Sequence, residues 1–277
     1  MIQGRHSSVP SANVKRAFAR AKSFLREYPR SGMFPSLSND SQSDKRPDSE
    51  ARMLPGTDQD RSIEAAIDDF RRILSADGTL DGDGDGPDII LRQITGLEAG
   101  AAEKGFLHRD LIPDLRGGVE HDVTFDAATG TVLKFTKPDR AAYAVNFDLG
   151  TPSMVPATPL DYLERLRLQN EIFGDKLRFV GIASDGNFRR IVTRQDLVTG
   201  KPAWWDDIVR MMADLGFSKL RHNHGIGYED SYAFLRDDTV VFDLRPANVF
   251  VTDDGIVVPV DCIPVRLPSG KRAFFEK

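Results

Sequence analysis

The stretch Val240-Val241-Phe242-Asp243-Leu244-Arg245-Pro246-Ala247-Asn248 decides how this sequence is interpreted. Its first three residues are β-branched or aromatic, so they predict a short buried strand that ends at Asp243. Asn248 follows five residues later, and a loop of that length can return it to the side of Asp243. We therefore expect a carboxylate and a carboxamide to point into one site.

A second acid, Asp261, follows the next predicted hairpin, which turns at Asp253-Asp254-Gly255. Magnesium prefers oxygen ligands and is commonly held by one or two carboxylates together with phosphate oxygens. Asn248 and Asp261 are therefore candidate magnesium ligands. Phosphoryl transfer also needs a carboxylate that orients the attacking hydroxyl, and Asp243 is the candidate for that role.

Lys134 supplies a cation that could contact phosphates. It is the single charge in the predicted strand Val132-Leu133-Lys134-Phe135, where apolar neighbours present one ammonium group. The predicted helix at 159–173 carries Glu164 and Glu171. Either glutamate could pair with Lys134 and hold it in place.

Gly117 and Gly118 come before the lysine. They lack a Cβ, so the backbone there can approach a phosphate closely. Taken singly, each of these features has an ordinary explanation as a turn, a strand end or a solvated lysine. Their joint order favours a phosphoryl-transfer site: glycines, strand lysine, helix with glutamates, the Asp and Asn pair, hairpin, and an acid at a strand end.

At these residues the chain resembles protein kinases and aminoglycoside-phosphotransferase-like enzymes. The run from Asp243 to Asn248 is similar to their catalytic loop, Asp261-Cys262-Ile263 is similar to the metal-binding DFG motif, and Lys134 is similar to the lysine of the third strand. A closer similarity is to the kinase-like domain found in polyvalent proteins of phages and conjugative elements. The residues that suggest it are 117–123, 132–136, 162–175, 191–195 and 259–261.

The resemblance implies an α+β, two-lobed protein-kinase-like fold with a truncated C-terminal lobe, preceded by N-terminal helices. It implies that Mg²⁺ and ATP bind between the lobes, and that the backbone of the hinge Gln195-Asp196-Leu197 meets the adenine. The expected divisions are a basic helix and disordered linker, a helical extension, a β-rich lobe and a small C-terminal lobe, at 1–60, 61–106, 107–195 and 196–268.

The chain also departs from the kinase pattern. Val241-Phe242 stands where a His-Arg pair is usual, and Cys262-Ile263 stands where Phe-Gly is usual. Sixteen residues follow Asp261, which are too few for a typical protein-substrate platform. We therefore expect an ATP- and Mg-dependent phosphotransferase, Ser/Thr/Tyr-kinase-like, that acts on a protein or small-molecule acceptor. The alternatives are a pseudokinase-like binding module and a small-molecule kinase.

Hydrophobic periodicity places these motifs on a mixed sequence of helices and hairpins. The helix at 89–106 is expected to break near Gly96 and Gly100, because glycine weakens helices. The other predicted helices are 61–75, 159–173 and 203–215. The predicted strands are 121–125, 131–136, 177–184, 189–195, 240–242, 249–252 and 256–260.

The composition is that of an ordinary globular protein, since 40% of the residues are apolar and the net charge is −5. The single cysteine, Cys262, excludes an internal disulfide and indicates a reducing compartment, so we expect a cytoplasmic protein. No apolar run approaches the roughly 20 residues of a membrane span. Residues 1–30 hold seven basic side chains against one acidic, and a predicted helix at 12–28 could bind a partner.

Overall fold

The computed structural model describes residues 54–78, 87–116, 118–147 and 151–275. The predicted basic helix at 12–28 and Gly117 lie outside the described residues. Among the described residues, no helix combines the length and the apolar content that crossing a membrane requires.

The largest sheet has six strands, which are β1 (Arg61–Ser62), β2 (Leu107–His108), β3 (His121–Asp126), β4 (Thr131–Thr136), β7 (Arg178–Ser184) and β8 (Arg189–Asp196). The strand order is β1-β7-β8-β4-β3, and β2 pairs with β7 outside this path. The pairing of β2 with β7 is parallel, whereas the other pairs are antiparallel. The two predicted hairpins, β3–β4 and β7–β8, are confirmed.

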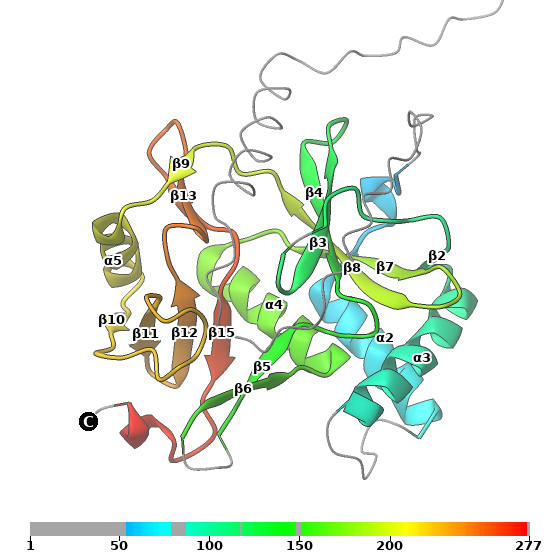
Figure 1. Cartoon of the computed structure of the whole chain (residues 1–277), viewed down its shortest axis with the longest axis horizontal. Helices are drawn as coiled ribbons and strands as arrows, with labels where there is room; N and C mark the ends of the chain where they lie inside the picture. The colour runs from blue at the N-terminus through cyan, green and yellow to red at the C-terminus, as the bar shows by residue number, and fades with distance from the viewer. Residues whose placement is uncertain (1–53, 79–86, 117, 148–150, 276–277) are drawn as a thin grey trace, which may run out of the picture.

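Three helices lie along one face of this sheet, namely α2 (Ile63–Ala76), α3 (Pro87–Lys104) and α4 (Pro159–Phe173) (Figure 1). Their apolar side chains form a core with Phe179 and Ile182 of β7. The opposite face of the sheet carries a smaller cluster that includes Leu133 and Phe135 of β4. Since side chains alternate along a strand, Lys134 lies on the face that carries α4.

Helix α4 has the bounds predicted from the sequence, because both of its ends carry strong signals. Thr158 and Asp161 form a capping box at the start, with Pro159 in the first turn. Gly174 ends the helix in a left-handed conformation with φ of 68°.

The predicted break in α3 is wrong, since the helix runs without interruption through Gly96 and Gly100. A Cβ added to Gly100 would lie 2.6 Å from the side chain of Ile73 on α2. The glycine therefore allows two helices to pack closely, and the gain from that contact outweighs the low helix propensity of glycine.

The remaining elements form smaller sheets around one further helix. The strands β10 (Ser218–Lys219), β11 (Tyr232–Arg236), β12 (Thr239–Leu244) and β15 (Ile263–Arg266) pair in that order. A second sheet has the order β14 (Val257–Pro259), β13 (Val249–Val251) and β9 (Lys201–Pro202), and α5 (Trp205–Asp214) packs against both. Single-turn helices η1 (Thr57–Gln59) and η2 (Arg272–Phe274) flank the described chain.

A hairpin that the sequence did not predict, β5 (Tyr143–Asn146) and β6 (Ser153–Pro156), joins the two groups of elements (Figure 1). Ala144 packs against the core of α2, α3 and α4. Val145 and Met154 pack instead against the core beneath β12 and β15. The mixture of helices with mainly antiparallel sheets confirms the predicted α+β class.

Strand β12 is buried on both faces, as predicted for the residues before Asp243. Val240 and Phe242 belong to one core, and Val241 belongs to the core of α5. All three side chains are 0% exposed. The residues at the usual His-Arg position are therefore packing residues in this chain.

Residues 54–60, which composition assigns to the linker, are held against the large sheet. Arg194 of β8 donates from Nε to Asp60 at 2.6 Å and from Nη2 to the carbonyl of Pro55 at 2.6 Å. The same guanidinium contacts Asp126 of β3 at 3.1 Å. The predicted disordered linker is therefore wrong for residues 54–60, because this buried arginine binds them to the sheet.

Candidate functional site

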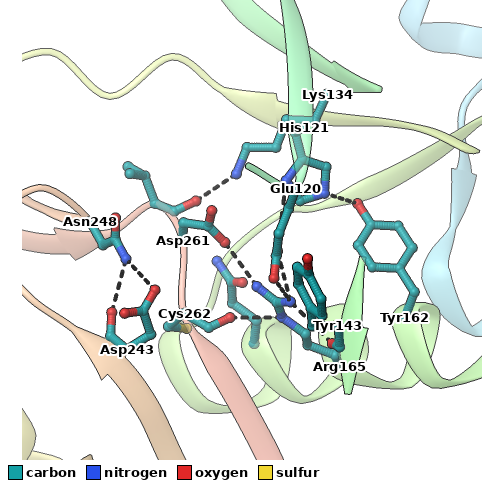
Figure 2. Close-up of polar contacts among 12 residues, drawn as sticks. Glu120, His121, Lys134, Tyr143, Tyr162, Arg165, Asp243, Asn248, Asp261 and Cys262 are labelled. Atoms are coloured by element: carbon teal, nitrogen blue, oxygen red, sulfur yellow. Dashed lines mark hydrogen bonds and ion pairs between the residues drawn. The ribbon is translucent and has the colours of Figure 1, made fainter. Parts of the chain in front are cut away.

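Lys134 reaches from β4 to the segment between β14 and β15. Its Nζ donates to the carbonyl of Val260 at 2.6 Å, directly before Asp261 (Figure 2). The lysine therefore faces Asp261, as the sequence-based hypothesis requires. Its charge also acts on Asp175, a largely buried acid that follows α4.

Asp243 closes β12 in a left-handed conformation with φ of 59°, which is uncommon for a residue other than glycine. Its Oδ1 accepts a hydrogen bond from the backbone N–H of Tyr228 at 3.0 Å. The backbone of Gly227 passes so close that an added Cβ would lie 2.6 Å from the Asp243 carboxylate. The strained backbone and these contacts hold the carboxylate in one orientation.

Asn248 lies beside Asp243, as predicted. Its Nδ2 donates to Oδ2 of Asp243 and to the Asp243 carbonyl, both at 2.9 Å. The carbonyl of Asn248 accepts from the backbone N–H groups of Val260 and Asp261, at 2.8 and 3.4 Å. The loop after β12 and the segment after β14 are thereby joined.

Burial raises the pKa of Asp243 above its ordinary value, against the opposing effects of the Tyr228 N–H group and Arg245. The Arg245 Nε lies 3.7 Å from Oδ1 of Asp243. That Nε is buried and makes no hydrogen bond to the described residues. Its guanidinium stacks over the ring of Tyr228, 3.7 Å from the ring centroid.

Asp261 is a carboxylate between two cations. Partial burial would raise its pKa, but the charges of Lys134 and Arg165 keep the pKa below its ordinary value. Its side chain remains 38% exposed. Asp261 is therefore ionised near neutral pH and accessible from solvent.

Arg165 of α4 is the site residue that the sequence hypothesis missed. Its side chain is 6% exposed, and its Nη1 donates to both carboxylate oxygens of Glu120 at 2.9 and 3.0 Å (Figure 2). Nη2 donates to Oδ1 of Asp261 at 3.0 Å. A signal existed, because Arg165 shares the buried helix stripe of Tyr162, Leu166 and Gln169.

The pKa values of Glu120 and His121, which lie near Arg165, are shifted by burial. Burial raises the pKa of Glu120 to about 7, although the charge of Arg165 acts in the opposite direction. The His121 side chain is 9% exposed, and burial lowers its pKa to about 3, so its ring is neutral. Its Nε2 lies 3.0 Å from the hydroxyl of Tyr162. Glu120, His121 and Asp261 each offer one potential ligand atom, all within 4.8 Å of one another.

The predicted pairing of Lys134 with Glu164 or Glu171 is wrong. Glu164 contacts Arg71 at 3.0 Å and Arg167 at 2.7 Å. Glu171 contacts Arg167 at 3.3 Å and Arg266 at 2.7 Å. The two glutamates lie seven residues apart on the outward face of α4, because the inward face is the stripe that contains Arg165.

The backbone of Gln195-Asp196-Leu197, which was predicted to contact adenine, is engaged in pairing with β4 and with the turn before it. Gln195 pairs with Val132 and Asp196 pairs with Thr131 in the sheet. The N–H group of Leu197 donates to the carbonyl of Gly130 at 2.9 Å. The Leu197 N–H group is therefore engaged within the sheet, and the connection to β9 starts only after this residue.

Of the two predicted glycines, Gly118 is described. A Cβ on Gly118 would lie 2.2 Å from the carbonyl oxygen of His121. Glycine is thus required by the turn that leads into β3. The turn places Glu120 against Arg165. The turn is therefore part of the site through Glu120, independently of any contact with a phosphate.

Residues 114–267 match a family described as serine/threonine/tyrosine kinase found in polyvalent proteins. The match covers more than half of the chain and includes Lys134, Asp243, Asn248 and Asp261. Neither the curated proteins nor the solved structures gave a match.

Proposed function

Because the chain belongs to the serine/threonine/tyrosine kinase family found in polyvalent proteins, we propose that it transfers the terminal phosphoryl group of ATP to a hydroxyl acceptor. The observation that carries this proposal is the convergence of Lys134, Asp243, Asn248 and Asp261 on one site. These residues come from three separate segments of the chain.

The residues Asn248 and Asp261 fit a magnesium ion. The Nδ2 group of Asn248 is bound to Asp243, so its Oδ1 is the atom left to meet a cation. Asp261 is ionised, partly exposed and joined to Asn248 through the backbone. Carboxylate and carboxamide oxygens are suitable magnesium ligands. When bound, the metal would neutralise charge on the phosphates of the nucleotide.

Lys134 would hold the non-transferred phosphates. Its ammonium group lies at the Val260 carbonyl, next to the carboxylate of Asp261, so metal and lysine would contact one triphosphate from two sides. The mobile end of a lysine can exchange a carbonyl for a phosphate oxygen without a change in the backbone. Gly117 and Gly118 would allow the turn before β3 to cover the same phosphates.

Asp243 would orient the acceptor hydroxyl and accept its proton. Each of its oxygens takes one hydrogen bond, from Tyr228 and from Asn248, and retains a lone pair for the acceptor. Its raised pKa makes it a stronger base than an exposed aspartate. Arg245, 3.7 Å away, places a positive charge beside the reacting groups.

The arrangement in two lobes belongs to this proposal. We assign the strands of the large sheet from β2 to β8, together with α4, over 107–195, to one lobe and the elements over 196–268 to the other. The extension at 61–106 packs on the first lobe through α2 and α3. Glu164, Glu171 and the hinge residues Gln195-Asp196-Leu197 are left out of the nucleotide site, because their partners lie elsewhere.

A non-catalytic binding module is the second candidate, and the position of Arg165 favours it. One carboxylate oxygen of Asp261 is already bound to that arginine. If the protein is a catalyst, its acceptor is a protein or a small molecule. A small-molecule kinase needs less of a protein-binding platform than a protein kinase does.

Turnover separates these candidates. ATP hydrolysis and phosphoryl transfer are followed with labelled ATP against a protein mixture and against small hydroxylated molecules. The wild-type protein is expected to transfer phosphate, and Asp243→Ala is expected to lose transfer while it still binds Mg-ATP. Binding without transfer in the wild type would support the binding module instead.

A further inference from the structure

Three consecutive residues, Val260, Asp261 and Cys262, are held by two buried or half-buried cations. Lys134 bonds the carbonyl of Val260. Arg165 bonds the carboxylate of Asp261 at 3.0 Å and, through Nε, the carbonyl of Cys262 at 2.9 Å. The predicted metal ligand is therefore fixed both by its side chain and by the backbone on each side of it.

The remaining bonds of Arg165 reach other parts of the site. Its Nη1 forms a bidentate contact with Glu120 and lies 3.4 Å from the carbonyl of Tyr143 on β5. A guanidinium is planar and offers donors in a fixed fork, so one side chain can fix several acceptors at once. Lysine in the same place could not reproduce this set of contacts.

We propose that Arg165 is the positioning residue of the metal site, and that the Arg165–Glu120 pair takes the place of the lysine–glutamate pair expected at this position. The proposal rests on the proposed function. Arg165 binds Oδ1 of Asp261 and so directs Oδ2 toward the cation. Asp261 would then bind magnesium through one oxygen.

Helix α4, which carries Arg165, also contacts the extension at 61–106. Glu164, the residue before Arg165, pairs with Arg71 of α2 at 3.0 Å. Tyr162, Leu163 and Leu166 of α4 lie in the core shared with α2. Because Arg165 is carried by α4, displacement of that helix would move the carboxylate that binds the metal.

The test measures how much magnesium strengthens ATP binding. The affinity for ATP is determined by calorimetry with Mg²⁺ and again with EDTA, and the ratio of the two is compared between proteins. The main variant combines Arg165→Met with Glu120→Gln, so that no buried carboxylate is left unpaired. The control is Arg167→Met, which changes an arginine on the outward face of the same helix.

We expect the double variant to lose about tenfold or more of the magnesium gain, which is the usual effect of removing a residue that orients a metal ligand. Its affinity for ATP in EDTA should change much less. Arg167→Met should keep the wild-type gain. A purely structural role would lower both affinities together or alter the unfolding temperature alone.

A double variant that keeps the wild-type magnesium gain overturns the role of Arg165 and leaves the proposed function intact. A wild-type protein that does not bind ATP overturns both. If circular dichroism shows that the double variant does not fold, Arg165→Lys takes its place, because it keeps the charge and loses the fork. A normal magnesium gain in Arg165→Lys then overturns the proposal.

Discussion

Replacing Arg194 with methionine should strongly destabilise the protein. The Arg194 side chain is 4% exposed, and it contacts the carboxylates of Asp60 and Asp126, which are 0% and 7% exposed. Methionine fills a similar volume but leaves two buried carboxylates without their cation. Burial already raises the pKa of Asp60 against the effect of Arg194, so the unpaired group would be costly.

The magnitude follows from this geometry. Removing one partner of a buried ion pair typically costs about 3–5 kcal/mol. For a domain of roughly 150–250 residues, each kcal/mol lowers the melting temperature by about 2–4 °C. We therefore expect Arg194→Met to lower the melting temperature by about 6–20 °C, with the large value applying if neither carboxylate relaxes toward water.

Thermal unfolding followed by circular dichroism at pH 7 measures this effect. The control is Arg178→Met, because Arg178 is an exposed residue of β7 that lines one small cavity together with Asp60 and Arg194, and it acts on Asp60 only through its charge. That variant should stay within about 0.5 kcal/mol of the wild type, as surface substitutions usually do. Equal and small losses in both variants would refute the claim that Arg194 anchors residues 54–60 to the sheet.

Three further outcomes are expected. Gly100→Ala should destabilise the protein by about 1–3 kcal/mol in urea unfolding, since its Cβ would overlap Ile73; an unchanged midpoint would contradict the close helix packing. Glu164→Gln and Glu171→Gln should leave the affinity for ATP in calorimetry within about twofold of the wild type, because both glutamates pair with arginines outside the site. A tenfold loss, which is about 1.4 kcal/mol, would instead indicate that one of them pairs with Lys134. Asp122→Asn should lower the melting temperature more at pH 7 than at about pH 3: burial by itself would raise the pKa of Asp122, but two neighbouring cations outweigh it and keep the pKa below its ordinary value, so the stabilisation is complete above the ordinary pKa and is lost as pH falls through the lowered value. A melting-temperature difference that is the same at both pH values would contradict that assignment.

Local signals in the sequence were sufficient for much of the secondary structure. The bounds of α4 could be predicted because Thr158, Pro159 and Gly174 mark its ends independently of tertiary packing. Strand β12 could be predicted from a run of apolar residues that are buried on both faces. The short strands β10 and β11 and the hairpin β5–β6 were not predicted, since packing against distant segments stabilises them more than their own sequence does.

Glycine has two different roles in the helices of this chain. Gly174 ends a helix in the left-handed region, where glycine has a local advantage. Gly100 lies inside α3, where a local rule predicts a break. Its role depends on Ile73, a residue of another helix, and no local rule contains that information.

The site itself was predicted in part. Asp243 and Asn248 are close in sequence, so loop length alone indicated their contact. The partner of Lys134 depends on which face of α4 points inward. Charge alone favours Glu164 and Glu171 as partners of the lysine, whereas the periodicity of Tyr162, Leu166 and Gln169 places Arg165 on the inner face. The face of α4 on which a charged residue lies therefore determines whether it reaches the site, and its charge alone does not.

The contact between Arg165 and Glu120 could not be derived from either residue alone. Their segments are 45 residues apart, and the turn at Gly118 determines where Glu120 points. The pair also shows why the structure supports a modified kinase-like site. An arginine on α4 holds the acid that the sequence pattern assigns to the metal.

Magnesium-dependent stabilisation by nucleotide tests the central claim most directly. The melting temperature of the wild-type protein is measured with ATP and Mg²⁺, with ATP and EDTA, and without nucleotide. Asp261→Ala is compared with Asp253→Ala, an exposed acid in the preceding turn. At a ligand concentration about 100 times the dissociation constant, binding should add about 2.7 kcal/mol to the wild type and to Asp253→Ala, but not to Asp261→Ala. A wild-type melting temperature that does not change with Mg-ATP would contradict the assignment of this site to a nucleotide and its metal.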